Sequence, residues 1–358
     1  MACTSHTVRA GHAARNTLAV LAHLPCQDGS STLGRPASAA DGQPVGTRPI
    51  GAIVRPHVWI PERTPAPQRD RLAELTELYV FPAAGPIGNL PAGDMLVAAY
   101  DVSRALDIAR HIDGLRAIQA FSAGVDSIAD RIPAGVTLCD AAGVHDVAVA
   151  EWAVMSILAS RRRLPEHLDA QRSGTWRKES IVGEDLADAV VVIVGAGSIG
   201  RAVEARLSPF GASIIRVARR PRDGVIPFSD LPTVLPRADV VVSLLPLTAE
   251  TRGLIDARII GAMRPGALLV NASRGQVVDS TAMTAAVLDG RIKVALDVTD
   301  PEPLPEGHPL WASPGAIITP HVASDVRRED ERAWQLVYEQ VGRLARGESL
   351  ANVVVDGY

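Results

Sequence analysis

The chain has 358 residues, of which 47% are hydrophobic and 4% aromatic, and its formal net charge is −4 at pH 7. This length allows two domains that each bury a core, and the slight negative charge gives no reason to expect nucleic acid or an anionic membrane as a partner. No apolar run reaches the roughly 18 residues of a membrane span, and the cysteines lack the spacing of a metal site. We therefore expect a soluble, cytoplasmic protein without a metal ion.

Residues 1–48 differ in composition from the rest of the chain. They are rich in Ala, Ser, Gly and Thr, contain no Glu, and show no sustained hydrophobic periodicity. A segment of this kind buries too little apolar surface to offset the entropy lost on ordering. We expect a disordered extension here.

Residues 50–143 alternate between short apolar runs and helical patterns. The predicted helices cover residues 68–75 and 103–112, and the predicted strands cover residues 52–54, 78–81, 95–100, 115–120 and 136–139. Such alternation is typical of a small doubly wound α/β unit.

A Gly-x-Gly-x-x-Gly motif, formed by Gly195, Gly197 and Gly200, follows five consecutive β-branched residues at 190–194. A run that is apolar on both faces predicts a parallel strand covered by helices. In a dinucleotide-binding turn, Gly195 makes the tight bend, Gly197 lets the backbone approach a pyrophosphate, and Gly200 allows close packing of the next helix. That helix directs the N–H groups of its first turn at the phosphates. The alternative is a glycine-rich turn without a ligand.

The regions before and after this motif complete an open α/β pattern. A helix over 146–163 is apolar enough to lie against another element or a second subunit. The motif is followed by predicted helices, including 281–289 and 328–346, and by predicted strands at 213–217, 239–245, 267–271, 293–298 and 316–319. The order predicts a parallel sheet with helices on both faces.

The end of the second strand of this sheet distinguishes NAD from NADP. An NAD site places a carboxylate there, about 20 residues beyond the glycines, on the ribose 2′-hydroxyl. In this chain the position holds Ala218, which is followed by Arg219 and Arg220. A guanidinium binds a 2′-phosphate well, and no carboxylate repels it. The pattern favours NADP over NAD, unless the two arginines are simply solvated surface charges.

Arg274, Glu302 and His321 each come shortly after a predicted strand of the same sheet. The carboxyl ends of parallel strands meet at one edge, so these side chains are expected at one crevice with the glycine loop. A guanidinium holds a carboxylate, a histidine exchanges a proton near neutral pH, and a neighbouring carboxylate stabilises the imidazolium. The combination favours hydride transfer to and from a 2-hydroxy acid.

Motifs spread over more than half of the chain resemble those of the D-isomer-specific 2-hydroxyacid dehydrogenases, which include glyoxylate and hydroxypyruvate reductases. An ordered series of motifs is more specific than any single one. The matching stretches are Ser122-Ala-Gly-Val-Asp126, Val149-Ala-Glu151, the glycine loop, Leu245-Pro-Leu-Thr248, Glu250-Thr-Arg252, Asn271-Ala-Ser-Arg-Gly275, Leu296-Asp-Val298, Glu302-Pro303 and Thr319-Pro-His321.

The resemblance implies a role for each matching residue. It makes His321 the acid–base, Glu302 its partner, Arg274 the substrate anchor, and Asp297 a ligand of the nicotinamide carboxamide. Backbone of the smaller domain is implied to bind the substrate carboxylate at Ala123, Gly124 and Val125. The remaining residues implied to contact the cofactor are Ser198, Ile199, Pro246, Thr251, Ala272, Ser273 and Ser324.

The resemblance also implies a division into two domains. Residues 49–145 together with 322–358 form a smaller, flavodoxin-like substrate domain, and residues 146–321 form a Rossmann dinucleotide-binding domain. Dimerisation through the helix before the glycine loop is implied as well. The expected protein is a homodimeric NAD(P)-dependent oxidoreductase that acts on small 2-keto acids and D-2-hydroxy acids. The alternative, from another class, is a nucleotide-sensing binding protein that resembles corepressors of this fold.

Overall fold

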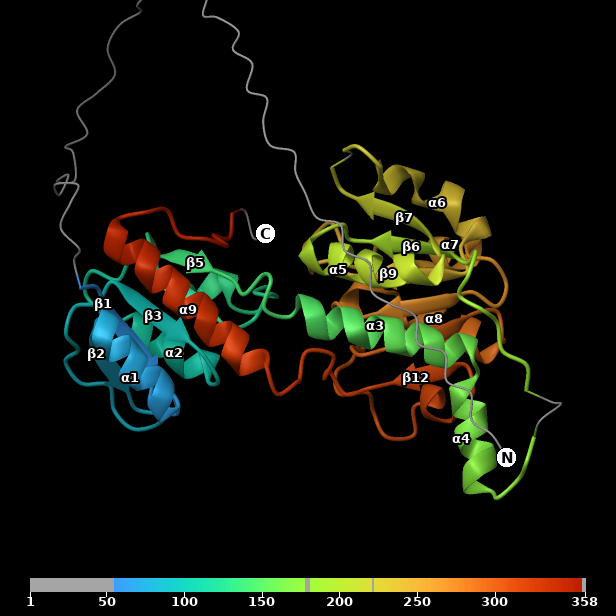
Figure 1. The fold of residues 1–358 in the computed structure, drawn as a ribbon, viewed down its shortest axis with the longest axis horizontal. Helices are drawn as coiled ribbons and strands as arrows, with labels where there is room; N and C mark the ends of the chain where they lie inside the picture. Colours follow the sequence, from blue (N-terminus) through green and yellow to red (C-terminus); the bar gives the residue numbers. More distant parts are fainter. Residues whose placement is uncertain (1–54, 178–180, 221, 356–358) are drawn as a thin grey trace, which may run out of the picture. The chain divides into compact units, whose positions relative to one another are not determined.

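The computed structural model describes residues 55–177, 181–220 and 222–355. The disordered extension predicted for residues 1–48 and the strand predicted at 52–54 lie outside the described residues. The described part of the chain contains two β-sheets whose neighbouring strands are all parallel (Figure 1). Residues 50–358, which include both sheets, group as one unit by their contacts. The predicted α/β fold with two parallel sheets is confirmed.

The smaller sheet has five strands in the order β2-β1-β3-β4-β5, which is the flavodoxin-like order. Helices α1 and α9 pack on one face of it and α2 on the other (Figure 1). The elements are β1 (His57–Pro61), α1 (Ala66–Leu75), β2 (Glu77–Phe81), β3 (Met95–Ala98), α2 (Val102–Ala109), β4 (Ala117–Ala120), β5 (Thr137–Cys139) and α9 (Glu329–Arg346).

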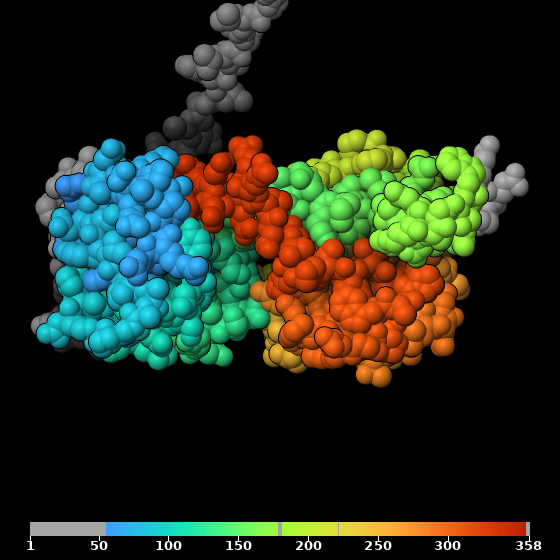
Figure 2. Space-filling view, turned by 90° about the horizontal axis from the view of Figure 1, so that it is seen from below, coloured from blue at the N-terminus to red at the C-terminus, as the bar shows by residue number. Residues whose placement is uncertain are grey.

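Helix α9 reaches the smaller sheet from the other end of the chain. Its Trp334, Val337 and Val341 are buried in one cluster with Val58 and Met95 of the sheet. In Figure 2 the red surface of this helix lies beside the blue surface of the first described residues. The smaller sheet therefore depends on segments that are far apart in the sequence.

The smaller sheet also contains a buried polar pair, Gln119 of β4 and Gln340 of α9, both 0% exposed. Gln340 Nε2 donates to Gln119 Oε1 at 2.8 Å and to the Ala351 carbonyl at 2.8 Å, while Gln340 Oε1 accepts from Ala351 N. Gln119 Nε2 in turn donates to the carbonyls of Ala120 and Asp140. Both amides thus have partners, as buried polar groups require.

The larger sheet has seven strands in the order β12-β11-β10-β9-β6-β7-β8. Helices α3 and α5 cover one face, and α6, α7 and α8 cover the other (Figure 1). Its strands are β6 (Val190–Val194), β7 (Ser213–Ala218), β8 (Val225–Pro227), β9 (Val240–Ser243), β10 (Leu268–Asn271), β11 (Lys293–Leu296) and β12 (Ala316–Ile318). Its helices are α3 (Asp146–Arg161), α4 (Leu164–Arg172), α5 (Ser198–Leu207), α6 (Leu231–Val234), α7 (Ala257–Ala262) and α8 (Ser280–Leu288).

Strand β6 marks the point where the strand order of the larger sheet reverses. The chain adds β7 and β8 on one side of β6, and β9 to β12 on the other. In open α/β sheets, ligands bind outside the carboxyl ends of the strands at such a switch point. The glycine loop, which follows β6 directly, lies there. None of the helices in the described ranges is long and apolar enough to cross a membrane.

Strand β1 and helix α4 were not predicted, and prolines explain both differences. Pro56 precedes β1 and Pro61 is its last residue, and a proline in an apolar run argues against a strand on sequence grounds. The helix predicted over 146–163 ends at Arg161, and the chain turns at Arg163 with φ 52°. A new helix then begins with Pro165 in its first turn, where the missing N–H costs nothing. Strand β8 and the short helices α6 and α7 were also missed.

Candidate active site

The glycine loop is packed tightly on its protein side and open at its centre. A Cβ at Gly195, where φ is 115°, would lie 2.6 Å from the Leu244 carbonyl oxygen, and one at Gly200 would lie 2.2 Å from the Gly195 oxygen. A Cβ at Gly197 would meet no heavy atom within 4 Å. Helix α5 begins at Ser198, and the N–H groups of its first turn have no partner within the helix. Backbone donors with this free space suit the pyrophosphate of a dinucleotide.

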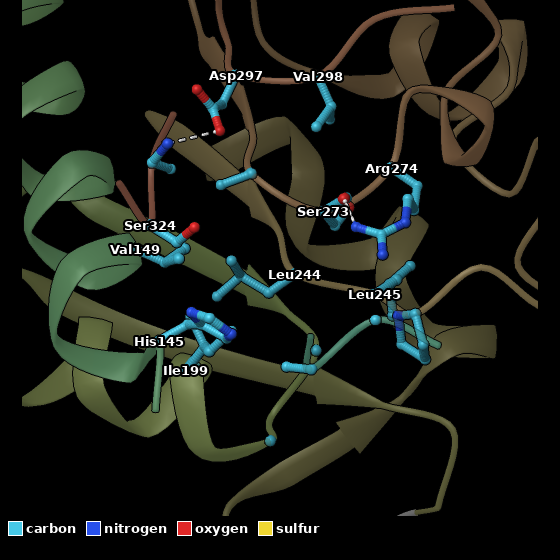
Figure 3. Close-up of a pocket in the computed structure, with 18 of the residues that line it drawn as sticks. His145, Val149, Ile199, Leu244, Leu245, Ser273, Arg274, Asp297, Val298 and Ser324 are labelled. Carbon is cyan, nitrogen blue, oxygen red and sulfur yellow. Dashed lines mark hydrogen bonds between the residues drawn. The ribbon is translucent and has the colours of Figure 1, made fainter. Parts of the chain in front are cut away.

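A pocket extends from the glycine loop to the turn that follows β4 (Figure 3). Figure 3 shows His145, Val149 and Ile199 on one side of it and Arg274 and Leu245 on the other. The predicted site residues that line this pocket are Ala123, Gly124, Gly195, Gly197, Ser198, Ile199, Gly200, Pro246, Ala272, Ser273, Arg274, Asp297, His321 and Ser324. The fold thus brings most of the predicted residues from both sheets together.

Five described residues that were predicted for the site are not part of this lining: Val125, Arg219, Arg220, Thr251 and Glu302. Val125 is fully buried in the core behind the turn. The Thr251 hydroxyl donates to the Pro246 carbonyl at 2.6 Å, so it stabilises its own turn. Within the described ranges, no three His, Cys, Asp or Glu side chains are placed to hold a metal ion.

His321 and Glu302 are in direct contact at the edge of the pocket. His321 Nδ1 lies 2.6 Å from Glu302 Oε1, and both side chains are less than half exposed, at 47% and 40%. A carboxylate on Nδ1 fixes the ring orientation and leaves Nε2 as the nitrogen that exchanges protons. The two residues can therefore act as an acid–base and its orienting partner.

Arg274 is held in place by the turn that it belongs to and by the smaller sheet. The buried Asn271, at the end of β10, donates from Nδ2 to the Arg274 carbonyl and accepts from Ser273 N and Oγ. The guanidinium donates from Nη1 to the Ser273 carbonyl at 2.8 Å (Figure 3) and from Nε to Asp126 Oδ1 at 3.0 Å. A Cβ at Gly124 would lie 1.7 Å from Nη2, so the guanidinium rests on the backbone of this turn.

Asp297 is buried, at 3% exposure, and its carboxylate accepts hydrogen bonds from the main chain beside His321. Val322 N donates to Oδ1 and Ala323 N donates to Oδ2, each at 2.9 Å, and Figure 3 draws the second bond. Asp297 thus stabilises the turn that carries His321, in addition to lining the pocket.

Asp126, His145 and Arg222 are among the residues in or near the pocket that were not predicted for the site. His145 is 9% exposed and lines the pocket. Its Nε2 lies 2.8 Å from the Phe121 carbonyl oxygen and its Nδ1 lies 3.2 Å from Glu329 Oε1. A lone histidine at the start of a predicted helix carries no sequence signal for such a role. Asp126 belongs to the motif at residues 122–126, which indicated a backbone role only.

The region after β7 contains three arginines near the glycine loop. Arg222 donates from Nη2 to the Ala196 carbonyl at 2.6 Å, which joins this segment to the loop. Arg219 Nη1 lies 3.7 Å from Glu250 Oε2, and the two side chains are 57% and 70% exposed. An exposed pair of this kind contributes little stability, so Arg219 can exchange Glu250 for another anion.

The described geometry agrees with comparisons to known proteins. Residues 154–323 match the NAD binding domain of the D-isomer specific 2-hydroxyacid dehydrogenases. The chain is 31% identical over 316 residues to a glyoxylate reductase from Thermofilum pendens, and the match covers 83% of this chain and 93% of that protein.

Two solved structures are similar to this chain over nearly their whole length. A D-isomer specific 2-hydroxyacid dehydrogenase from Xanthobacter autotrophicus Py2, in complex with NADPH and MES, has a TM-score of 0.73 at 28% identity and covers 85% of this chain and 100% of its own. An NADPH-dependent glyoxylate/hydroxypyruvate reductase from Sinorhizobium meliloti, in complex with NADP and sulfate, has a TM-score of 0.72 at 26% identity, with coverages of 84% and 100%.

Proposed function

The chain belongs to the D-isomer-specific 2-hydroxyacid dehydrogenase family, and we propose that it reduces a small 2-keto acid with NADPH, using His321 as the acid. Membership makes the protein an NAD(P)-dependent oxidoreductase. The specific roles of its residues, the NADP form and the assembly are proposals. We also propose the domain division into residues 49–145 with 322–358 and residues 146–321.

The cofactor is held by the glycine loop and by the edge of the larger sheet. The backbone from Gly195 to Gly200 binds the pyrophosphate, because Gly197 leaves space there and the first turn of α5 offers its N–H groups. Ala272, Ser273 and Asp297 line the pocket after β10 and β11 and would hold the nicotinamide. The nicotinamide, when bound, supplies the hydride to C2 of the keto acid.

The keto acid carboxylate is bound between Arg274 and the turn after β4. Arg274 donates from Nε to the Asp126 carboxylate and from Nη1 to the Ser273 carbonyl, and its Nη2 lies against Gly124. The guanidinium and the turn at Ala123 and Gly124, which line the pocket together, therefore form one surface for an anion. A planar guanidinium on this surface also orients the carbonyl that is reduced.

His321 supplies the proton of the reaction. Glu302 holds Nδ1, so Nε2 of the imidazolium donates to the C2 oxygen as the alcohol forms, and accepts the proton in the reverse direction. The Glu302 carboxylate also fixes the orientation of the ring during the transfer. This His321–Glu302 contact at the pocket edge is the observation that carries the proposal.

Replacement of His321 tests the proposal directly. We expect His321→Ala to lower kcat at least about a hundredfold, because positioned acid–base catalysis contributes about 10²–10⁴-fold. The affinity for NADPH, measured by fluorescence titration, should change little, since the glycine loop is untouched. Glu302→Gln is expected to lower kcat less, because the ring keeps a hydrogen-bond partner. Wild-type turnover in His321→Ala would remove His321 from the mechanism.

NADP is the proposed form of the cofactor. Arg219, Arg220 and Arg222 follow β7, and Ala218 stands where a carboxylate would repel a 2′-phosphate. Arg222 is bonded to the glycine loop, and Arg219 is paired with an exposed carboxylate. The two similar solved structures have NADPH or NADP bound, which supports the same preference here.

A homodimer through α3 and α4 is the proposed assembly. Large apolar side chains are exposed on these helices and on the segment after them, with Trp176 91% exposed. They are Val147, Met155, Leu164, Leu168, Trp176 and Val182. Several exposed large apolar side chains on successive helices are typical of an interface, and a second copy buries them symmetrically.

Light scattering after size exclusion tests this assembly. Met155→Glu should convert the dimer to a monomer, because it introduces two like charges into the interface. Leu288→Glu is the matched control, since Leu288 is also exposed, at 53%, but lies on α8. A monomeric wild-type protein would contradict the dimer.

A further inference from the structure

The backbone of His321 is held in an uncommon conformation. Its φ is 57°, in the left-handed region that non-glycine residues rarely adopt. A residue persists there only when its surroundings fix it. His321 N donates to the Asp297 carbonyl oxygen at 2.7 Å, which is the first of these contacts. The position of the ring thus depends on residues that hold the turn at 319–323.

The Asp297 carboxylate holds this turn in place by accepting hydrogen bonds from it. It accepts from Val322 N and Ala323 N, and its Oδ1 also accepts from the Thr319 hydroxyl at 2.6 Å. The carboxylate is buried, so each of these donors replaces a lost water contact. Loss of the Thr319 donor leaves the carboxylate with its two main-chain donors and so weakens its hold on the turn.

Trp152 determines the direction of the Thr319 hydroxyl. Trp152 lies on α3, is 7% exposed, and its Nε1 lies 3.0 Å from Thr319 Oγ1, 167 residues further along the chain. An indole N–H can only donate, so Thr319 Oγ1 must accept from it. The single hydroxyl proton is then directed at Asp297. The chain of bonds runs from Trp152 through Thr319 and the Asp297 carboxylate to the main chain of Val322 and Ala323, directly after His321.

We propose that Trp152 and Thr319 are positioning residues of the reaction, which fix the turn of His321 through Asp297. The inference rests on the proposed role of His321 as the acid. Neither side chain lines the pocket, and both act through Asp297. The contact also links α3, which precedes the glycine loop, to the turn that carries the acid.

Two substitutions remove these bonds while they keep most of the packing. Thr319→Val removes the hydroxyl, and we expect kcat to fall about ten- to a hundredfold because the buried Asp297 carboxylate and the Trp152 N–H both lose a partner. Trp152→Phe removes the indole N–H alone, and we expect a fall of about three- to tenfold. Thr319→Ser retains the hydroxyl and should restore kcat. NADPH affinity should fall less than kcat in Thr319→Val and Trp152→Phe, because neither alters the glycine loop and only the part of the cofactor site at Asp297 is loosened.

Amide hydrogen exchange gives a readout that is independent of turnover. The amides of Val322 and Ala323 donate to Asp297, so their exchange should be about tenfold faster in Thr319→Val, as expected for loss of about one hydrogen bond. Thr319→Ser should exchange like the wild type. Ile157→Val is the matched control for Trp152→Phe, because Ile157 is buried in the same cluster and on the same helix but carries no polar group.

The outcomes separate this inference from the proposed function. Wild-type kcat and unchanged exchange in Thr319→Val and Trp152→Phe would overturn the positioning role, even if His321→Ala is inactive. A loss of kcat in Ile157→Val equal to that in Trp152→Phe would assign the effect to packing and also overturn it. If His321→Ala keeps wild-type turnover, the proposed function fails, and faster exchange in Thr319→Val still supports the network around the turn.

Discussion

The larger sheet supplies side chains to the pocket, whereas the smaller sheet supplies mainly backbone. Arg274, Asp297 and His321 follow β10, β11 and β12, and each extends a functional group into or beside the pocket. The smaller sheet contributes the turn after β4, where Ala123 and Gly124 offer little beyond N–H and C=O groups. The larger sheet therefore contributes the side chains that bind and react. The smaller sheet contributes backbone that lies close to them.

A buried polar pair lies inside the smaller sheet, whereas the buried Asn271 and Asp297 of the larger sheet lie at its strand ends beside the pocket. Strands β6 and β9 of the larger sheet bury apolar residues almost throughout. The smaller sheet buries Gln119 and Gln340, which connect β4, α9 and the segment at Ala351. Hydrogen bonds to fixed partners specify one arrangement more strictly than apolar contacts do. The pair is well placed to fix the turn that meets Arg274.

Gly124→Ala should show the largest effect on the contribution of the smaller sheet. The methyl group would lie 1.7 Å from Arg274 Nη2, so the guanidinium must move. We expect kcat/KM for the keto acid to fall about a hundredfold, because a displacement of about 1 Å at a substrate anchor can cost that much. Steady-state kinetics with a cofactor titration checks the result, and NADPH affinity should stay near the wild-type value.

Gly197→Ala is the matched variant on the larger sheet. Its φ is −77° and no heavy atom lies within 4 Å of the added methyl, so the fold should not change. Affinity for NADPH should fall about tenfold, or about 1.4 kcal/mol, because the methyl takes the space of the pyrophosphate. Identical kinetic defects in the two glycine variants would contradict the division between the sheets.

Joint replacement of Arg219 and Arg220 by Ala sharpens the comparison within the cofactor site. We expect KM for NADPH to rise at least about tenfold while KM for NADH changes little, since a hydrogen bond to a charged group contributes about 1.5–3 kcal/mol. Arg222→Ala should weaken both cofactors, because it releases the Ala196 carbonyl of the glycine loop. Equally weakened binding of NADPH and NADH in the double variant would show that Arg219 and Arg220 do not bind the 2′-phosphate.

Gln340→Leu tests the polar core of the smaller sheet. It leaves Gln119 Oε1 and the backbone of Ala351 without a partner, so we expect a loss of about 1–3 kcal/mol in the free energy of unfolding. Urea titrations of this variant, of Gln119→Leu and of the double variant form a cycle. The double variant should cost less than the sum, because one substitution already breaks the shared bond. Strict additivity would show that the two amides are not coupled.

The smallest effect concerns Cys139 at the end of β5. Burial raises the pKa of its thiol to about 11, so the group stays protonated at pH 8 and below. Because the thiolate is the nucleophile, we expect Cys139 to react with iodoacetamide far more slowly in the native protein than in urea. Mass spectrometry of the peptide that contains Cys139 measures both rates. Equal rates would show that this part of the smaller sheet opens readily.

The sequence allowed prediction of the fold and of the family, and both are confirmed. Arg274 and His321 could be placed near the glycine loop because the carboxyl ends of parallel strands share one edge of the sheet. This rule can be applied without knowledge of any side-chain contact. The contact between Arg274 and Gly124 could not be predicted, since it depends on how the turn after β4 approaches β10. The contact between Trp152 and Thr319 could not be predicted either, because a tryptophan among apolar residues is typical of a buried core residue.

The differences in secondary structure have local causes. Proline made His57–Pro61 look unlike a strand, although its backbone pairs with both neighbours.

Thr251 is expected at the cofactor by resemblance, and in the structure its hydroxyl is bonded inside its own turn. Hydrogen bonds of this kind are decided by a few tenths of an ångström and leave no pattern in a single sequence.

The most direct test measures the loss of nicotinamide absorbance with the purified protein. The substrates are glyoxylate, hydroxypyruvate, pyruvate, phenylpyruvate and 2-ketoisocaproate, each with NADPH and with NADH. We expect turnover of at least one of these keto acids, a preference for NADPH, and loss of that turnover in His321→Ala. Tight cofactor binding with no turnover on any acid would contradict this expectation and would favour a nucleotide-sensing binding protein instead.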